Sequence, residues 1–405
     1  MHLKEYFVGS LKLIFKGSKS YWAWVSLLLI FIALGVIAYQ YQLRNGLIVT
    51  SMRDQVSWGF YIGNFTFLVG VAAAAIMLVV PAYVYNWGPL KEIVILGELL
   101  AISAILMCIM FIVVDMGHPE RLWHMIPFIG ILKLGNSILA WDSIALSIYL
   151  VLNIVIVFHI LYRAFKLRQY NKKLVVPLVL LSIPMGIAIH TITAFLYDGI
   201  AARPFWNSAI LAPKFLISAF CSGPAIMIIL FQILRKATTL KISNVAIWKL
   251  AELMAYAMFF NLFLVGAELF KEFYSNTEHF VFSQYLYFGI GEHNTIVPFG
   301  RLSLLFDVIA FFLFLIPATR KNPITLNIGA VLIFAGVYIE KGIGLIIPGF
   351  TPDSLGEIYE YFPSLTEIFV TAGIFSAGFL IYTIMLKVAV PIVLGEFHYK
   401  KQPDK

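Results

Sequence analysis

The residues best suited to proton chemistry form one short stretch, Asp115-Met-Gly-His-Pro-Glu-Arg-Leu-Trp-His124. It combines a carboxylate, an imidazole, a guanidinium and a second imidazole. Histidine titrates near neutral pH, and a neighbouring carboxylate can fix its tautomer or take its proton onward. A quinone needs two hydrogen-bonding partners for its carbonyls, a route for two protons and an apolar slot, and this stretch offers the polar groups. The same residues are also ordinary at the polar edge of a membrane helix, so both interpretations stay open here.

The composition places these residues in a membrane protein. Of the 405 residues, 61% are hydrophobic and 12% are charged, and the mean hydropathy is +0.90. A soluble domain carries about 25% charged and about 45–50% apolar residues. This excess of apolar residues excludes a soluble enzyme, a disordered chain and a protein held by a single anchor. The predicted fold class is all-α, a polytopic transmembrane helix bundle.

Ten apolar runs are long enough to cross about 30 Å of hydrocarbon, which takes about 20 residues each. The runs cover about 21–41, 57–85, 91–114, 138–162, 174–198, 211–233, 246–270, 296–318, 324–347 and 364–392. Nineteen Lys and Arg residues fall on the side of the N-terminus and eight on the other side. Because basic loops stay in the cytoplasm, we predict an N-in, C-in topology with a cytoplasmic N-terminus at 1–20, a membrane domain at 21–392 and a cytoplasmic tail at 393–405. The same bias explains the net charge of +8, so this charge is not evidence for a nucleic-acid partner.

Ionisable residues inside the predicted spans gather near the outer loops. Each costs about 2.5–3.5 kcal/mol on insertion scales, so each needs a role. The outer half holds Asp142, His190, Asp198, Glu268, Arg301, Glu340, Lys341 and Glu367, with Asp307 nearer the middle. Ion pairs such as Glu340 with Lys341 would staple the bundle, whereas a polar cluster under one face indicates a site that opens to that face. The candidates for a proton path from the inner side are Glu98, Asp198, Glu252, Glu268 and Asp307.

Two other function classes stay open. A haem b cytochrome needs two histidines on facing helices, and the histidines inside the spans, His159 and His190, lie at different depths. The chain has two cysteines, which cannot form a four-cysteine iron–sulfur site. Ten spans also permit an ion or solute transporter, with Gly59–Gly63 and Gly342–Gly344 as candidate helix breaks.

Several segments carry a resemblance to a known family. They are Trp58-Gly-Phe-Tyr-Ile-Gly-Asn-Phe-Thr-Phe-Leu-Val-Gly70, Asp115-Met-Gly-His-Pro-Glu-Arg121, Ile189-His-Thr-Ile-Thr-Ala-Phe195, Arg203-Pro-Phe-Trp206, Ala212-Pro-Lys-Phe215, Ser222-Gly-Pro224, Asn261 with Glu268, and Ile339-Glu-Lys341 followed by Pro348. In these segments the sequence resembles the NrfD-like family, the membrane subunits of polysulfide reductase and related respiratory complexes. Its length is most similar to the ten-span branch, and within it to the DsrP-like subunit of the sulfite-reduction-associated DsrMKJOP complex.

The resemblance implies a subunit that binds menaquinone or menaquinol and itself holds no haem, iron–sulfur cluster or metal. It implies a place in the cytoplasmic membrane of a prokaryote, with the quinone near the outer face. Electrons would be exchanged with an outward-facing ferredoxin-like iron–sulfur subunit and further redox subunits of one complex. Proton translocation coupled to this exchange is a hypothesis, and the resemblance leaves the direction of electron transfer open.

The resemblance also assigns site residues by position, near the outer ends of the second to fifth spans. Tyr61 and Asn64 occupy the second-span segment, where the family uses polar groups as quinone ligands. His118 and Asp142 are the implied pair for hydrogen bonding and proton exchange. The residues that would orient or supplement this pair are Asp115, Arg121 and His190.

Overall fold

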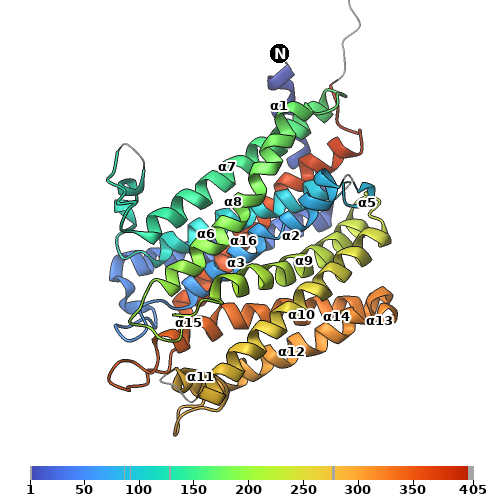
Figure 1. Cartoon of the computed structure of the whole chain (residues 1–405). Coiled ribbons are helices and arrows are strands. Elements are labelled where there is room, and N and C mark those ends of the chain that lie inside the picture. The colour runs from blue at the N-terminus through green and yellow to red at the C-terminus, as the bar shows by residue number, and fades with distance from the viewer. Residues whose placement is uncertain (1, 86, 92, 127–128, 276–278, 400–405) are drawn as a thin grey trace, which may run out of the picture.

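The computed structural model describes residues 2–85, 87–91, 93–126, 129–275 and 279–399. In these ranges every regular element is a helix, and one isolated β-bridge joins Ile290 to His293. The long helices run roughly along one common direction, as Figure 1 shows. The prediction of an all-α bundle is confirmed.

Ten helical segments are long and apolar enough to cross a membrane. They are α2 (Lys19–Asn45), α3 (Phe60–Ala73) with α4 (Ile76–Val79) and the π-helical turn η2 (Val80–Val84), α6 (Val94–Asp115), α7 (Ile138–Phe165), α8 (Lys172–Asp198), α9 (Leu211–Ala237), α10 (Asn244–Ser275), α12 (Val297–Leu315), α14 (Pro323–Lys341) with α15 (Ile343–Phe350), and α16 (Leu365–Val393). Each overlaps one predicted apolar run, so the predicted number of spans is confirmed. The chain is an integral membrane protein.

Short helices lie at the two ends of the bundle. The end that carries both chain termini, here called the termini end, holds α1 (His2–Ile14), α5 (Gly88–Lys91) and α13 (Pro317–Lys321). The opposite end, here called the loop end, holds η1 (Leu47–Val49), η3 (Pro119–Met125) and α11 (Phe280–Tyr287). The rings of His2 and Tyr399 are 4.3 Å apart, so the first and last described residues lie on the same side of the bundle. That this side faces the cytoplasm stays a prediction, and residues 400–405 of the predicted tail lie outside the described ranges.

The basic N-terminus is a helix, α1, where the sequence predicted only a cytoplasmic segment. Tyr6 of α1 is buried against Phe165 and Tyr162 of α7, with ring centroids 5.3 Å and 5.6 Å apart. Phe7 and Leu11 of α1 are exposed. An apolar exposed face next to lysines is typical of a helix that lies in the membrane interface.

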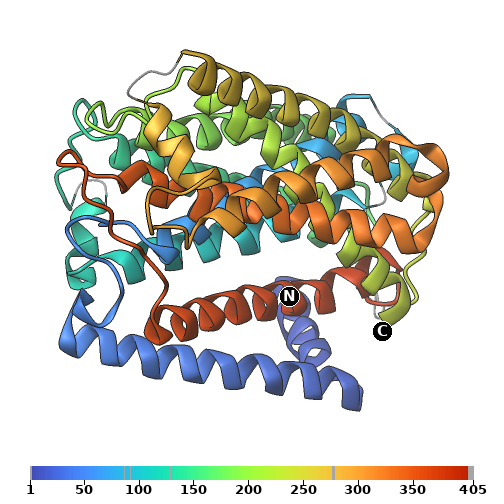
Figure 2. The ribbon, with the colours of Figure 1, turned by 90° about the horizontal axis from the view of Figure 1, so that it is seen from below.

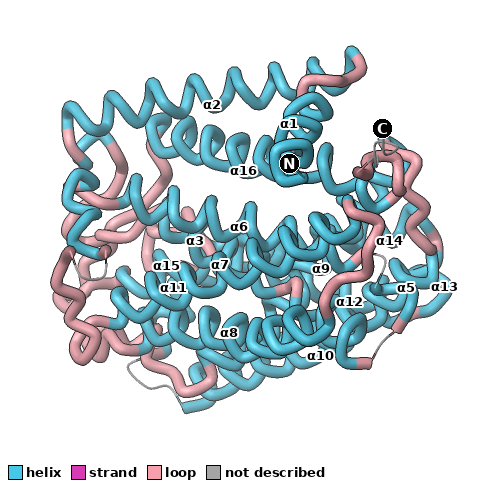
Figure 3. Tube along the Cα trace, turned by 90° about the horizontal axis from the view of Figure 1, so that it is seen from above, coloured by secondary structure: helices cyan, strands magenta, loops and turns pink. Residues whose placement is uncertain are grey.

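The first and last spans, α2 and α16, form a pair along one flank of the bundle (Figures 2 and 3). Their backbones approach closely where Gly35 meets Gly373, because a Cβ atom on Gly35 would lie 2.7 Å from the Cα atom of Gly373. Small residues at a crossing let membrane helices pack by van der Waals contact. The eight intervening spans form the rest of the bundle.

One of the two candidate helix breaks is present. α14 ends at Lys341 and α15 begins at Ile343, so the ninth span is interrupted at Gly342. The Gly59–Gly63 segment is no break, because α3 starts at Phe60 and includes Gly63. In the second span the α-helix is instead interrupted after Ala73.

Candidate functional site

A cavity of about 80 Å³ lies beneath the loop end, between the start of α3 and the break in the ninth span. Its lining residues are Gly59, Phe60, Gly63, Asn64, Phe299, Tyr338, Ile339, Gly342, Ile343, Ile346, Ile347 and Tyr361. We call it the Asn64 cavity. Most of these side chains are apolar, and the polar side chains come from Asn64, Tyr338 and Tyr361. An apolar pocket with a few placed polar groups is the usual form of a small-molecule site.

Asn64 and Tyr338 join two helices at this cavity. The Tyr338 hydroxyl of α14 donates to Asn64 Oδ1 of α3 at 2.7 Å, and Asn64 Nδ2 donates to the Phe60 carbonyl at 2.7 Å. Asn64 is buried. An amide and a phenol both carry N–H or O–H donors that a ligand carbonyl can accept. These bonds leave the second N–H of the Asn64 amide for a ligand carbonyl, and the Tyr338 hydroxyl oxygen can accept from a ligand O–H. The pair therefore offers one donor and one acceptor at the wall of an otherwise apolar cavity.

Tyr361 connects the cavity to a buried carboxylate. Its hydroxyl accepts from the Phe60 backbone N–H at 2.7 Å and donates to Glu367. Glu367 also accepts from the backbone N–H groups of Ser51, at 2.8 Å, and Ser364, at 2.9 Å. Burial, and secondly the adjacent Glu367 charge, raise the pKa of the Tyr361 hydroxyl, which keeps it protonated as a donor. These bonds fix the starts of α3 and α16 relative to the loop after α2.

Two glycines bring α3 against the break in the ninth span. A Cβ atom on Gly63 would lie 3.2 Å from the Cα atom of Gly342, about as close as real contacts allow. Glycine permits such an approach because it has no side chain. The Asn64 cavity therefore borders helix-terminal backbone of α14 and α15 as well as side chains.

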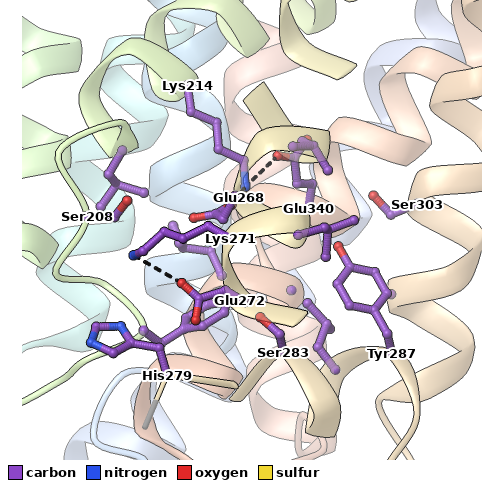
Figure 4. A pocket seen from close by; sticks show the side chains of 18 of the residues that line it. Ser208, Lys214, Glu268, Lys271, Glu272, His279, Ser283, Tyr287, Ser303 and Glu340 are labelled. Atoms are coloured by element: carbon purple, nitrogen blue, oxygen red, sulfur yellow. Dashed lines mark hydrogen bonds and ion pairs between the residues drawn. The ribbon is translucent and has the colours of Figure 1, made fainter. Parts of the chain in front are cut away.

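A second cavity, of about 50 Å³, lies between α9, α10, α11, α12 and α14. We call it the ionic cavity, and Figure 4 shows its polar lining residues: Ser208, Lys214, Glu268, Lys271, Glu272, His279, Ser283, Tyr287, Ser303 and Glu340. Lys214 Nζ lies 2.7 Å from a carboxylate oxygen of Glu268 and 3.2 Å from one of Glu340. The Nδ2 atom of Asn261 lies 3.4 Å from the other oxygen of Glu340. One ammonium group is thus shared by two carboxylates from different helices.

The structure does not bring His118 and Asp142 together as a hydrogen-bonded pair. His118 lies just before η3, its Nδ1 is 2.8 Å from Glu120 Oε1, and both side chains are exposed. A backbone N–H bond, followed by the bond to His118, holds the pKa of Glu120 below its usual value. Asp142 is buried in α7 and accepts from the Thr193 hydroxyl at 2.8 Å. Neither His118 nor Asp142 lines the Asn64 cavity.

Asn64 lines the cavity, and the other predicted ligands do not. Tyr61 is buried and donates to Gln42 Oε1 at 2.7 Å. Arg121 is exposed in η3, and Asp115 ends α6 half-buried. His190 is fully buried in α8, and neither ring nitrogen has a hydrogen-bond partner among the described residues. His159, the other candidate haem ligand, instead accepts from the Asn171 backbone N–H at 3.3 Å.

The five predicted proton-path residues fall in separate places. Glu268 lines the ionic cavity, and Asp307 is buried in α12, where a Cβ atom on Gly336 of α14 would meet its carboxylate. Asp198 accepts from the Ser208 backbone N–H at 3.0 Å. The remaining two lie away from both cavities: Glu98, buried in α6, and Glu252, which is 3.4 Å from Lys249 and 3.8 Å from Arg320.

The alternative of an ion pair between Glu340 and Lys341 is not what the structure shows for these two residues. Glu340 pairs with Lys214, whereas Lys341 Nζ donates to the Phe215 carbonyl at 2.7 Å. Neighbouring residues on a helix point about 100° apart, so their side chains do not face each other. Sequence reasoning also missed Tyr338 and Lys214 as site residues. Lys214 was counted only as an outer basic residue, although its position at the start of an apolar helix was visible.

The comparisons with known proteins place the chain in a family. The sequence profile described as "Polysulphide reductase, NrfD" matches residues 48–353. This chain belongs to the NrfD family. The match includes the eight spans from α3 to α15, and the α2–α16 pair flanks it. The NrfD region contains all lining residues of the ionic cavity and all those of the Asn64 cavity except Tyr361.

Two curated relatives are similar along nearly the whole NrfD chain. A selenate reductase subunit of Mesobacillus selenatarsenatis is 24% identical, over 92% of this chain and 96% of its own length. The "Hdr-like menaquinol oxidoreductase integral membrane subunit" of Archaeoglobus fulgidus is 22% identical, over 91% of this chain and 93% of its own. The similarity therefore extends beyond the family region.

Proposed function

We propose that this NrfD protein is the quinone-binding membrane subunit of a respiratory oxidoreductase complex, and that menaquinone or menaquinol binds in the Asn64 cavity. The proposal rests mainly on the bonded pair of Asn64 and Tyr338, which offers an amide donor and a hydroxyl acceptor in an apolar cavity beneath the loop end. A quinone head group presents carbonyls to such donors and apolar ring faces to such walls. The name of the Archaeoglobus relative, a menaquinol oxidoreductase subunit, supports the choice of quinone.

The partners follow from the same proposal. Both relatives are named as subunits, so we propose that this chain also works in a complex. In it the chain would exchange electrons with an iron–sulfur, ferredoxin-like subunit docked on the loop end. We place the loop end outside the cytoplasmic membrane of a prokaryote, in agreement with the charge bias. The DsrP-like branch remains our proposal for the complex, and an adjacent set of sulfite-reduction genes would test it.

The other predicted residues keep proposed roles around this cavity. We propose that His118 and Asp142 exchange protons near the loop end, with Asp115 and Arg121 beside them. Tyr61 and His190 complete the proposed surroundings. The residues proposed for proton movement through the rest of the bundle are Glu98, Asp198, Glu252, Glu268 and Asp307.

Binding of a fluorescence-quenching menaquinone analogue to the purified chain tests the function. We expect saturable quenching of the protein fluorescence in the wild type, and quenching that persists in His118→Ala and Asp142→Asn, because neither residue lines the cavity. Absence of saturable quenching in the wild type would contradict the proposed function. Loss of binding in both variants, with the helical content unchanged, would indicate that the quinone head group binds at His118 and Asp142 instead.

A second candidate function, an ion or solute transporter, has one observation in its favour. The ninth span is broken at Gly342 beside a buried ionic cluster, and transporters bind their substrates at broken helices. The same binding experiment separates the two, because a transporter without a redox role has no reason to bind a quinone analogue saturably. A haem b cytochrome would instead show a reduced α-band in the visible spectrum.

A further inference from the structure

A further inference concerns the ionic cavity, and it rests on the proposed quinone site. We propose that the ionic cavity exchanges the protons of the quinone with the loop-end surface, and that Glu340 is its proton-accepting residue next to the quinone. The proposal goes beyond quinone binding because it assigns a route and a direction, towards the loop end. It also uses residues, Lys214 and Glu340, that the predicted inner path did not include.

The charges in the ionic cavity are arranged to take up one proton. Lys214 is shared by Glu268 and Glu340, so the three groups together carry one negative charge in excess. Their side chains are only 15–21% exposed, in a region of low dielectric constant. A proton bound to either carboxylate makes the cluster neutral and still leaves Lys214 paired. A simple structural ion pair would have needed only one carboxylate.

The two cavities share one wall, which is the break in the ninth span. Tyr338, Gly342 and Ile343 line the Asn64 cavity, while Glu340 and Gly344 line the ionic cavity, and Ile339 lines both. Two glycines without side chains occupy the break, and Gly342 lines the Asn64 cavity while Gly344 lines the ionic cavity. Gly63 of α3 also lies against it. Glu340 follows Tyr338 by two residues, and its carboxylate lines the ionic cavity while Tyr338 lines the Asn64 cavity. The interrupted ninth span therefore separates the two side chains.

The ionic cavity continues from Glu340 towards the loop end. Glu272 and His279 line it on that side, and Lys271 Nζ lies 3.2 Å from Glu272 (Figure 4). Glu272 is buried, and its Oε2 atom has no hydrogen-bond partner among the described residues. A water needs about 10–15 Å³ and two or more polar partners, so a cavity of about 50 Å³ with these side chains can hold a short chain of waters. Such a chain conducts protons between carboxylates and an imidazole.

The proposed steps balance in protons and electrons. When a menaquinol is oxidised, its two O–H bonds break, and two electrons leave one at a time to one-electron carriers of the iron–sulfur type. Each proton forms a new O–H bond at Glu340 or an adjacent water and then passes through the ionic cavity to the loop end. Reduction of menaquinone by the same carriers reverses every step. The site itself undergoes no net change.

Carboxylate-to-amide variants of the whole complex test the route. Glu340→Gln is expected to lower quinol-dependent turnover by about 100-fold, while the affinity for the quinone analogue stays within about twofold of the wild type. The matched control is Glu357→Gln, an exposed glutamate of the loop end that lines neither cavity, which should keep wild-type turnover. Glu340→Asp should recover much of the lost rate. If Glu340→Gln does not fold, Glu268→Gln should show the same loss of turnover. In that variant Glu340 is the one carboxylate left beside Lys214, so no second carboxylate is available for the proton.

Chemical rescue separates proton transfer from a structural role. Formate added to Glu340→Gln is expected to restore turnover at least tenfold, because a small weak acid in the cavity replaces the missing carboxyl group. A structural defect would not respond to formate. Wild-type turnover in Glu340→Gln, or loss that formate leaves unchanged, would overturn the proposal. Failure of the wild-type chain to bind the quinone analogue would instead overturn the proposed quinone site.

Discussion

Replacement of Asn64 by leucine is expected to weaken binding of a menaquinone analogue by about tenfold to a hundredfold. The change removes the amide N–H that is not bonded to the Phe60 carbonyl from the wall of the Asn64 cavity, and it leaves the Tyr338 hydroxyl without its acceptor. A buried hydrogen bond together with an unsatisfied partner is worth about 1–3 kcal/mol, and about 1.4 kcal/mol is a tenfold change in affinity. Titration of the purified variant with a fluorescence-quenching analogue measures the effect.

The chain provides a matched control for Asn64. Asn153 in α7 is also buried, and its Nδ2 donates to the Tyr149 carbonyl one turn earlier at 2.7 Å, as Asn64 Nδ2 does to Phe60. Asn153 does not line the cavity. Asn153→Leu should therefore bind the analogue with the affinity of the wild type. Equal binding by Asn64→Leu and Asn153→Leu would show that the cavity does not hold the head group.

Truncation of Glu367 to alanine is expected to destabilise the loop end by about 3–5 kcal/mol, because a hydrogen bond to a charged group contributes about 1.5–3 kcal/mol and three such bonds are lost together. The carboxylate is fully buried and accepts from the N–H groups of Ser51 and Ser364 and from the Tyr361 hydroxyl. All three donors would be left without their acceptor, and the capping box of α16 would be lost. Chemical unfolding in detergent micelles, followed by tryptophan fluorescence, measures the loss of unfolding free energy.

The control for this prediction is Glu357→Ala, the same truncation at an exposed position of the adjacent loop. It should change the unfolding free energy by less than about 0.5 kcal/mol. A milder variant, Tyr361→Phe, removes one of the three bonds and should fall between the two. If Glu367→Ala unfolds like Glu357→Ala, the carboxylate does not organise the loop end.

The sequence was informative about spans and about Asn64 for physical reasons. A transmembrane helix requires about 20 apolar residues regardless of its neighbours, so the apolar runs alone predicted all ten. Asn64 is an amide in the middle of an otherwise apolar segment between Ile62 and Phe65, and such a residue needs a partner or a function. The break at Gly342 was visible as a pair of glycines inside an apolar run.

The pairing of polar groups was less accessible, because it depends on how distant helices face one another. In the sequence, Tyr338 is one of many aromatic residues within the spans. Only the packing of α14 against α3 brings the Tyr338 hydroxyl to Asn64. Lys214 and Glu340 are far apart along the chain, and only the packing of α9 against α14 brings them to 3.2 Å. His118 was predicted to be a site residue because an imidazole can exchange protons near neutral pH. In the structure it is exposed and lies beside Glu120.

Photoaffinity labelling with an azido-menaquinone analogue tests the central proposal most directly. After irradiation of the complex in membranes, proteolysis and mass spectrometry identify the labelled residues. We expect labelling at the start of α3, in residues 59–64, and at the α14–α15 break, in residues 338–347. Unlabelled menaquinone should compete for both sites and remove the label. Competed label confined to other spans, with none in these two segments, would contradict the proposal.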